Sequence, residues 1–331
     1  MPPHSYTLSM GISLTAAADD DGRRLDRILR KALRLTPLSA IHRMLRKGAV
    51  LVNGKAAAAD CRIHVGDTIT VPGKAGNGEW GIGNREWGMG NGERRTQNPY
   101  SLLPTPYSLP EILFEGSGLL AVNKPAGLPV HGKGSLEDLI LAYLGPKLPP
   151  SLSWRPGPLH RLDRPSSGIL VFSTNLEGAR LFSSLMRKRL IKKQYLCLVE
   201  GHIEKAEIWQ DELLRDENRK KTSTVVNGND GKIALTKVSP LIGNSDVTLI
   251  LADIETGRTH QIRAQATSHG HPLLGDLKYG ARKIHGDGFF LHAWRMELPA
   301  PLSRQIEAPL PEKFLKKNLE LFGVDFPRFF V

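Results

Sequence analysis

Hydrophobic residues near the start of the chain recur with the period of a helix. The positions i, i+3, i+4, i+7 and i+8 are occupied by Leu25, Ile28, Leu29, Ala32 and Leu33. Side chains at this spacing share one helical face. The stripe therefore predicts an amphipathic helix that buries these residues.

A second helical stripe follows at once and consists of Leu38, Ile41 and Leu45. Thr36 and Pro37 precede it, so we predict a helix start with threonine as the N-cap and proline in the first helical position. Gly48 is expected to end this helix, because glycine readily adopts the left-handed conformation that follows many helices.

Short β segments are predicted after the second helix. Residues 49–52 are rich in valine and end at Asn53 and Gly54, a pair that strongly favours a tight hairpin turn. Gly66 and Asp67 mark another turn before a β segment at 68–71. Residues 23–72 are thus expected to form one compact α/β domain.

Residues 73–110 differ in composition from the sequence on either side. The stretch from 74 to 108 is rich in Gly, Asn and Pro and repeats every seven residues, as in Asn77-Gly-Glu-Trp-Gly-Ile-Gly followed by Asn84-Arg-Glu-Trp-Gly-Met-Gly. Glycine and proline are incompatible with the apolar helix of a coiled coil. We predict a disordered linker. Stacking of Trp80 and Trp87 on nucleic-acid bases is the alternative.

Residues 111–331 are expected to form the second domain. Their strands and helices alternate without the regular βαβ spacing of a nucleotide-binding fold, which predicts a mixed, largely antiparallel sheet and an α+β protein. No G-x-G-x-x-G follows a strand, and no G-x-x-x-x-G-K-[ST] occurs. We therefore expect no nucleotide cofactor. The eleven histidines show no metal-ligand spacing, so no metal is expected, and Cys61 and Cys197 are expected to be free thiols.

The net positive charge of the chain favours a negatively charged partner. There are 45 Lys+Arg against 33 Asp+Glu, a net charge of +12, which favours RNA, DNA or an anionic membrane. No apolar run approaches the ~20 residues that span a bilayer, and the first 20 residues lack a signal-peptide pattern. We expect a cytoplasmic protein without a membrane partner.

The first domain carries much of this charge, with 11 Lys+Arg against 5 Asp+Glu in residues 20–72. His42, Arg43, Arg46 and Lys47 fall on the second predicted helix, opposite its apolar stripe. This geometry suits contacts with phosphates. On charge alone, a solvated helix face is an equally good interpretation.

Four ionisable residues cluster just before an apolar stretch of the second domain, namely His160, Arg161, Asp163 and Arg164. Unpaired buried charges cost several kcal/mol, so such a cluster is expected to be paired or used. The flanking arginines should favour the ionised form of Asp163, which could then act as a nucleophile or base. A purely structural Arg–Asp pair remains open. The segment matches neither H-R-D-L-x-x-x-N of protein kinases nor G-x-S-x-G of serine hydrolases.

The same segment resembles a known catalytic signature. His160-Arg-Leu-Asp-Arg-Pro-Ser-Ser-Gly-Ile-Leu is similar to H-R-L-D-x-x-T-S-G-L-L of the RluA-type pseudouridine synthases, with Ser166 in place of threonine. Residues 119–131, 192–201 and 255–276 resemble three further segments of that family, in the same order. The resemblance spans about 112–294.

The first domain has a resemblance of its own. Arg24-Leu-Asp-Arg-Ile-Leu, the basic second helix, Gly48-Ala-Val-Leu-Val-Asn-Gly-Lys and Val65-Gly-Asp-Thr-Ile together look like the ribosomal protein S-four type RNA-binding module. This resemblance favours RNA binding by residues 23–72, through Arg43, Arg46 and Lys47.

The family resemblance implies a cofactor-free isomerisation of uridine to pseudouridine. The target base leaves its stack, its glycosidic bond is broken, and the base is re-attached through a ring carbon. Asp163 would attack the sugar or the uracil ring, or assist elimination. Tyr195 would stack on the base and serve in proton transfer, Arg263 would pair with Asp163, and Leu291 would form an apolar wall. The remaining expected substrate or framework contacts are Lys124, His160, Arg161, Arg164, Arg258 and His260.

The expected partner is structured RNA, bound by a monomer. By analogy with family members that carry a similar N-terminal module, ribosomal RNA of the large subunit is favoured over transfer RNA. A non-catalytic RNA-binding or ribosome-associated protein with the same fold is the alternative function.

Overall fold

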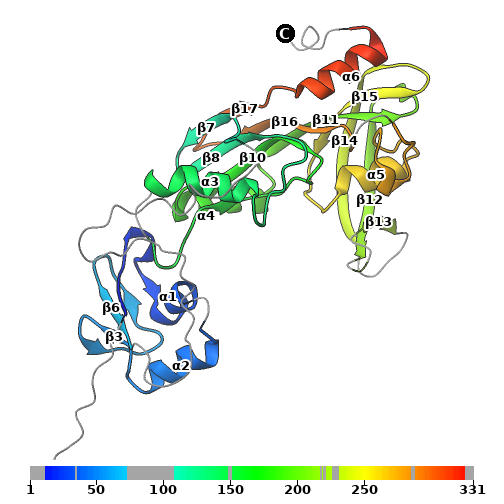
Figure 1. Ribbon diagram of the computed structural model, residues 1–331. Coiled ribbons are helices and arrows are strands. Elements are labelled where there is room, and N and C mark those ends of the chain that lie inside the picture. The colour runs from blue at the N-terminus through cyan, green and yellow to red at the C-terminus, as the bar shows by residue number, and fades with distance from the viewer. Residues whose placement is uncertain are drawn as a thin grey trace, which may run out of the picture. The chain divides into compact units, whose positions relative to one another are not determined.

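Figure 1 shows the computed structural model, which describes residues 12–33, 36–72, 108–147, 151–216, 218, 221–225, 231–284 and 288–324. The chain forms two compact units, of which one holds residues 1–103, 141–156 and 174–176 and the other 104–140, 157–173 and 177–331. The linker predicted over 73–110 lies outside the described residues from 73 to 107.

The N-terminal unit combines two helices with small antiparallel sheets. Its described strands form one sheet in the order β1 (Ile12–Thr15), β6 (Thr68–Val71), β3 (Leu51–Val52), β4 (Lys55–Ala56), and a separate pair of β2 (Arg23–Arg24) with β5 (Arg62–Ile63). The helices are α1 (Leu25–Ala32) and α2 (Leu38–Arg46), preceded by a short 3₁₀ helix, η1 (Ala18–Asp20).

The apolar stripes of α1 and α2 form the core of this unit, as their spacing predicts. Leu25, Ile28 and Leu29 are fully buried, and Ile41 and Leu45 pack in the same cluster. The exposed side of α2 carries the basic residues Arg43, Arg46 and Lys47. The predicted amphipathic arrangement is therefore present.

The ends of α2 agree with the sequence only in part. Pro37, with φ −56° and ψ 142°, occupies the N-cap, and no side chain caps the helix, so the predicted threonine cap is wrong. The ψ of Pro37 is extended rather than helical, which moves the helix start one residue along. Gly48 (φ 64°) follows the helix in the left-handed region, and Asn53 (φ 50°) and Gly54 (φ 78°) form the predicted tight turn between β3 and β4.

The second unit is built on one large sheet. Eleven of the described strands join it, in the order β13-β12-β14-β15-β11-β16-β10-β8-β7, with β17 beside β16 and β9 beside β10. The strands are β7 (Ile112–Gly116), β8 (Leu119–Lys124), β9 (Gly157–Pro158), β10 (Ser167–Ser173), β11 (Lys192–Glu200), β12 (Glu207–Asp216), β13 (Lys221–Val225), β14 (Lys232–Gly243), β15 (Val247–Ile254), β16 (Leu291–Leu298) and β17 (Arg304–Glu307).

Strand direction in this sheet is mixed, which confirms the predicted α+β class. Among the described strands, β10 and β16 pair in parallel, with Ser167 opposite His292 and Gly168 opposite Ala293, whereas the other neighbours are antiparallel. The remaining described helices of the chain are α3 (Leu136–Leu144), α4 (Leu176–Arg187), α5 (Gln261–Ser268) and α6 (Glu312–Phe322), with 3₁₀ turns η2 (Gly145–Lys147) and η3 (Leu277–Tyr279). Of these, η2, the end of α3 and Leu176 belong to the N-terminal unit. None of the described helices is both long and apolar enough to cross a membrane.

The two faces of β11 have different surroundings. Leu196 and Leu198 pack with Phe314 of α6 in one apolar cluster. Because successive side chains of a strand point to opposite faces, Tyr195 and Cys197 lie on the face away from α6. Helix α5 packs against β12 and β13, and the candidate site forms at its N-terminus.

Candidate active site

A buried lysine holds the loop that carries Asp163. Lys124 ends β8 and is fully buried. Its Nζ donates hydrogen bonds to three backbone carbonyls, those of Pro125 (3.0 Å), Arg164 (3.1 Å) and Ser166 (2.6 Å). Burial lowers its pKa to about 7, and the charge of Asp163 opposes this shift. All three donors of the ammonium group are used, so Lys124 fixes the shape of the loop.

The Asp163 carboxylate is held by the start of α5. Its Oδ2 accepts a hydrogen bond of 2.8 Å from Nη1 of Arg263, and its Oδ1 lies 3.5 Å from Nε2 of His260. The side chain keeps 16% of its surface exposed. The pairing of Asp163 with Arg263 that the family resemblance implies is therefore present, and the side chain is partly exposed.

Arg263 is fixed on three sides. Its Nε and Nη2 donate to Oδ2 (2.6 Å) and Oδ1 (2.8 Å) of Asp276, while the ring centroids of Tyr279 and Phe289 lie 4.6 and 4.4 Å from its Cζ. Burial lowers the pKa of Arg263, but the hydrogen bonds and charges of Asp276 and Asp163 outweigh it and raise the pKa. The guanidinium thus orients Asp163 and is itself held rigidly.

The start of α5 is anchored by the glutamine beside His260. Oε1 of Gln261 accepts hydrogen bonds from Thr256 Oγ1 (2.7 Å) and the Arg258 backbone N–H (3.0 Å). Its Nε2 donates to the Leu235 carbonyl (3.1 Å) and Thr236 Oγ1 (2.9 Å) on β14. These buried contacts fix the first turn of α5 and, with it, the position of Arg263.

His260 is neutral and lies between Asp163 and Tyr279. Burial lowers its pKa to about 4, although the nearby Asp163 opposes the shift. Tyr279 Oη accepts a hydrogen bond from the Thr222 N–H (3.0 Å) and lies 2.8 Å from Nδ1 of His260. In the tautomer that carries its proton on Nε2, the ring directs this proton at Asp163, and Nδ1 accepts a hydrogen bond from the Tyr279 hydroxyl.

Tyr195 lies on the face of β11 that points away from α6, and its hydroxyl is also neutral. It is 7% exposed on β11, opposite Ala293 of β16. Burial raises its pKa, and Cys197 and the charge of Asp163 act in the same direction. Its hydroxyl can donate a proton or a hydrogen bond at neutral pH, and its ring is available as a flat wall.

The structure does not bring His160 to this group. Its Nε2 accepts a hydrogen bond from the Val171 N–H (3.1 Å), and its ring stacks on Phe182. Burial lowers its pKa to about 3. The ring lies between β10 and α4, where it supports the strand that follows Asp163, and these contacts fit a framework role.

The arginines that flank Asp163 in the sequence also point elsewhere. Arg161 and Arg164 are exposed, and Nε of Arg164 donates to the Gly127 carbonyl (2.9 Å). Among the described residues, the basic side chains within ion-pair distance of Asp163 are the charged Arg263 and the neutral His260. The Arg–Asp pair that the sequence left open is therefore made with Arg263 and not with the flanking arginines, because consecutive residues of a turn point in different directions.

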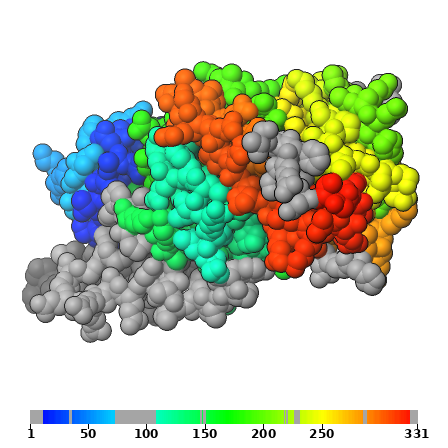
Figure 2. Space-filling model, turned by 90° about the horizontal axis from the view of Figure 1, so that it is seen from above, coloured from blue at the N-terminus to red at the C-terminus, as the bar shows by residue number. Residues whose placement is uncertain are grey.

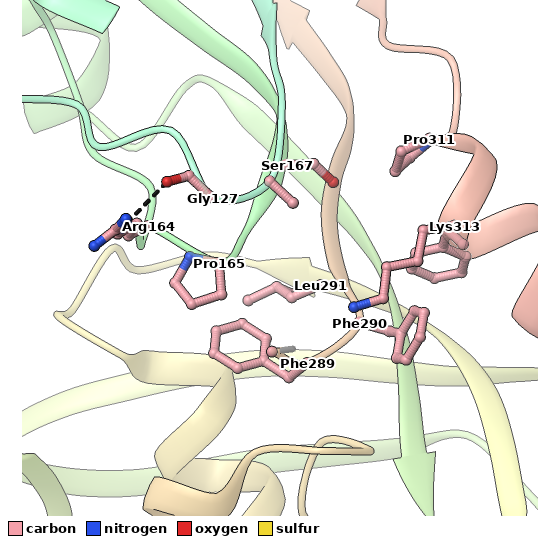
Figure 3. A pocket seen from close by; sticks show the side chains of 12 residues that line it. Gly127, Arg164, Pro165, Ser167, Phe289, Phe290, Leu291, Pro311 and Lys313 are labelled. Carbon is pink, nitrogen blue, oxygen red and sulfur yellow. Dashed lines mark hydrogen bonds between the residues drawn. The ribbon is translucent and has the colours of Figure 1, made fainter. Parts of the chain in front are cut away.

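Two further predicted residues lie around this group. Arg258 donates from Nε to the Ile233 carbonyl (3.1 Å), which places its side chain beside the start of β14. Leu291 begins β16 and lines a cavity that Phe289 and Pro165 also line (Figure 3). Asp276, Tyr279 and Phe289 were missed by the sequence interpretation, although Asp276 ends the segment 255–276 that resembles the family.

Comparison with known proteins identifies the family to which this chain belongs. The family model of RNA pseudouridylate synthase matches residues 118–268. A ribosomal large subunit pseudouridine synthase C of Vibrio cholerae serotype O1 (strain ATCC 39315 / El Tor Inaba N16961) is 31% identical over 307 residues, which cover 88% of this chain and 91% of that protein. The chain belongs to the RNA pseudouridine synthase family.

A second relative in sequence and a solved structure also match this chain. An uncharacterised RNA pseudouridine synthase of Bacillus subtilis (strain 168) is 32% identical over 327 residues, covering 94% of this chain and 99% of that protein. The structure of human RNA pseudouridylate synthase domain containing 1 superposes with a TM-score of 0.54 and 25% identity, over 64% of this chain and 88% of the other. These matches confirm the resemblance of residues 112–294 to the family and the isomerase class of the enzyme.

Proposed function

We propose that this pseudouridine synthase modifies uridines of large-subunit ribosomal RNA. The printed name of the Vibrio relative supports this substrate. The net charge of +12 supports a polyanionic partner. The observation that carries the catalytic part is the partly exposed Asp163 carboxylate, held between Arg263 and the neutral His260.

Asp163 is the catalytic residue of this proposal. Attack on the sugar carbon, attack on the uracil ring and assistance of elimination all use the same oriented carboxylate, and none needs a cofactor. The target uridine must leave its stack to reach it. Tyr195 then stacks on the flipped base and takes part in proton transfer, and the raised pKa of its buried hydroxyl keeps it protonated at neutral pH before the reaction.

The N-terminal unit is proposed to bind RNA as an S-four type module. The exposed residues Arg43, Arg46 and Lys47 follow one side of α2, opposite the buried stripe. Cations in such a row neutralise successive phosphates without reading the sequence. The module would thus add affinity for the RNA, and the second unit would select the uridine.

The proposal is tested by mapping pseudouridines in ribosomal RNA from a strain without this gene. One or a few pseudouridines are expected to disappear from the large-subunit RNA and to return with the wild-type gene. Asp163→Asn should restore less than a few per cent, because it removes the attacking charge and keeps the shape. A complete set of ribosomal pseudouridines in the deletion strain would reject the substrate, and full restoration by Asp163→Asn would reject the catalytic residue.

A further inference from the structure

A cavity of about 420 Å³ opens beside the candidate active site, within the second unit (Figure 3). It lies where β10 and β16 begin, and it is bordered by the loop after β8 and by the first turn of α6. Its walls are mostly apolar and include Pro165, Phe289, Phe290, Leu291, Pro311 and Phe314. A volume of a few hundred Å³ is typical of a pocket for a small organic group.

The cavity adjoins the catalytic residues but is separate from the site that would hold the reacting base. Asp163 and Tyr195 are not among its lining residues, whereas Arg164 and Pro165, the two residues after Asp163, are. Phe289 is shared, because its ring lines the cavity and also lies 4.4 Å from the Cζ of Arg263. A group in this cavity would therefore lie within a few ångströms of the residues that hold Asp163.

Two cations border this apolar space on different sides. Arg164 borders the cavity from the loop before β10, where its Nε donates to the Gly127 carbonyl (2.9 Å) and its side chain is exposed (Figure 3). Lys313 reaches in from α6, and its Nζ lies 5.3 Å from the ring centroid of Phe290. Apolar and aromatic walls bordered by cations suit a flat base that is linked to phosphates.

We infer that this cavity binds the base of a nucleotide adjacent to the target uridine in the RNA strand, with Arg164 and Lys313 on its phosphates. The inference rests on the proposed function, because it takes the neighbouring strand from an RNA whose uridine is presented to Asp163. The contact is made with an unpaired base, so the preferred target lies in a loop or bulge. The cavity thus adds a second point of attachment, which fixes the strand next to the flipped uridine.

The test uses RNA hairpins that carry the mapped target uridine, either intact or with an abasic nucleotide on its 5′ or 3′ side. For the wild-type enzyme, one of the two abasic hairpins should lose roughly tenfold in kcat/KM, mainly through KM, since stacking of a base contributes substantially to binding. Ala126→Trp places a large ring at the exposed edge of the cavity. This variant should lose a similar factor on the intact hairpin and show no further loss on the abasic one.

The charge contribution is tested separately on α6. Lys313→Gln should raise KM about two- to fivefold at low salt, with less effect at high salt. Lys316→Gln is the matched control, because Lys316 is exposed on the same helix but pairs with Glu312 and does not line the cavity. Thermal midpoints of all three variants should stay within a few degrees of the wild type.

Each outcome has one meaning. An abasic penalty that is absent on both sides, or that is equal in wild type and Ala126→Trp, overturns the inference while the proposed function stands. If the wild-type enzyme forms no pseudouridine on the intact hairpin, the proposed function falls and the inference falls with it.

Discussion

At the scale of single residues, the site depends on one arginine shared by two carboxylates. Asp276 takes two hydrogen bonds from Arg263 and is 2% exposed, whereas Asp163 takes one and is partly exposed. The two carboxylates therefore have different roles, although both are ion-pair partners. Asp276 holds Arg263, and Arg263 orients Asp163.

Asp276→Asn should lower the unfolding free energy more than Asp163→Asn does. The amide leaves the buried Arg263 without its bidentate partner, and breaking a buried pair in this way costs about 3–5 kcal/mol of unfolding free energy. Asp163→Asn should cost about 1 kcal/mol, because Arg263 keeps Asp276, while it removes activity. Urea unfolding and turnover of both variants test this, and equal stability losses would contradict it.

His292 is predicted to make folding dependent on pH. Its pKa is lowered to about 4 by burial, which is opposed by a hydrogen bond to the Ala308 carbonyl. The unfolded chain then binds the proton first, so this contribution to stability is complete above about pH 6.5 and is lost as the pH falls to about 4. The linked change is about 3 kcal/mol.

The pH prediction is checked with His292→Asn. Unfolding free energies of this variant and the wild type are measured between pH 4 and 7.5, and the wild type should lose stability more steeply below pH 6.5. Parallel curves would show that His292 takes no part. His160 and His260 contribute in the same direction, so the variant should keep some dependence on pH.

At the scale of elements, the helical stripes and the hairpin turn were predicted correctly from local sequence, the threonine N-cap of α2 was not, and pairings between distant segments were not accessible. The stripes of α1 and α2 and the Asn53-Gly54 turn follow from neighbouring residues. The strand order and the partner of Asp163, 100 positions away, depend on the whole sheet. Arg263 was found only through family resemblance, and the direction of Arg161 and Arg164 was misjudged because it is set by the turn.

The parallel junction of β10 with β16 offers an element-scale prediction. Gly168 has φ 104°, and a Cβ there would lie 2.2 Å from the Ala293 carbonyl oxygen and 2.7 Å from its nitrogen. Gly168→Ala should therefore separate the two strands, lower the unfolding free energy by about 2–5 kcal/mol and displace Asp163.

Thermal unfolding and turnover of Gly168→Ala are compared with Gly157→Ala in the neighbouring β9. A Cβ at Gly157 meets nothing within 4 Å, so this control should behave like the wild type. Equal midpoints for the two variants would show that the close approach of β10 and β16 is not needed.

At the scale of the whole molecule, the exposed basic face of α2 is expected to contribute to RNA binding. Replacing Arg43, Arg46 and Lys47 together by glutamine should weaken binding of structured RNA without changing the fold, since all three are exposed. If each neutralises one phosphate, the slope of log affinity against log salt should fall by roughly 2–3. Filter binding between 50 and 300 mM salt measures it, and an unchanged slope would show that this face of α2 does not contact RNA.

The parallel pairing of β10 with β16 also has a consequence for synthesis of the protein on the ribosome. Strand β10 is made more than a hundred residues before β16, and β16 is the strand that joins it to β11 and Tyr195. A nascent chain that ends before Leu291 therefore has Asp163, Tyr195 and Arg263 but no strand to bring them together. Contacts over such distances form late, so we expect activity to appear only after β16 has been synthesised, and chains that end before Leu291 to be inactive.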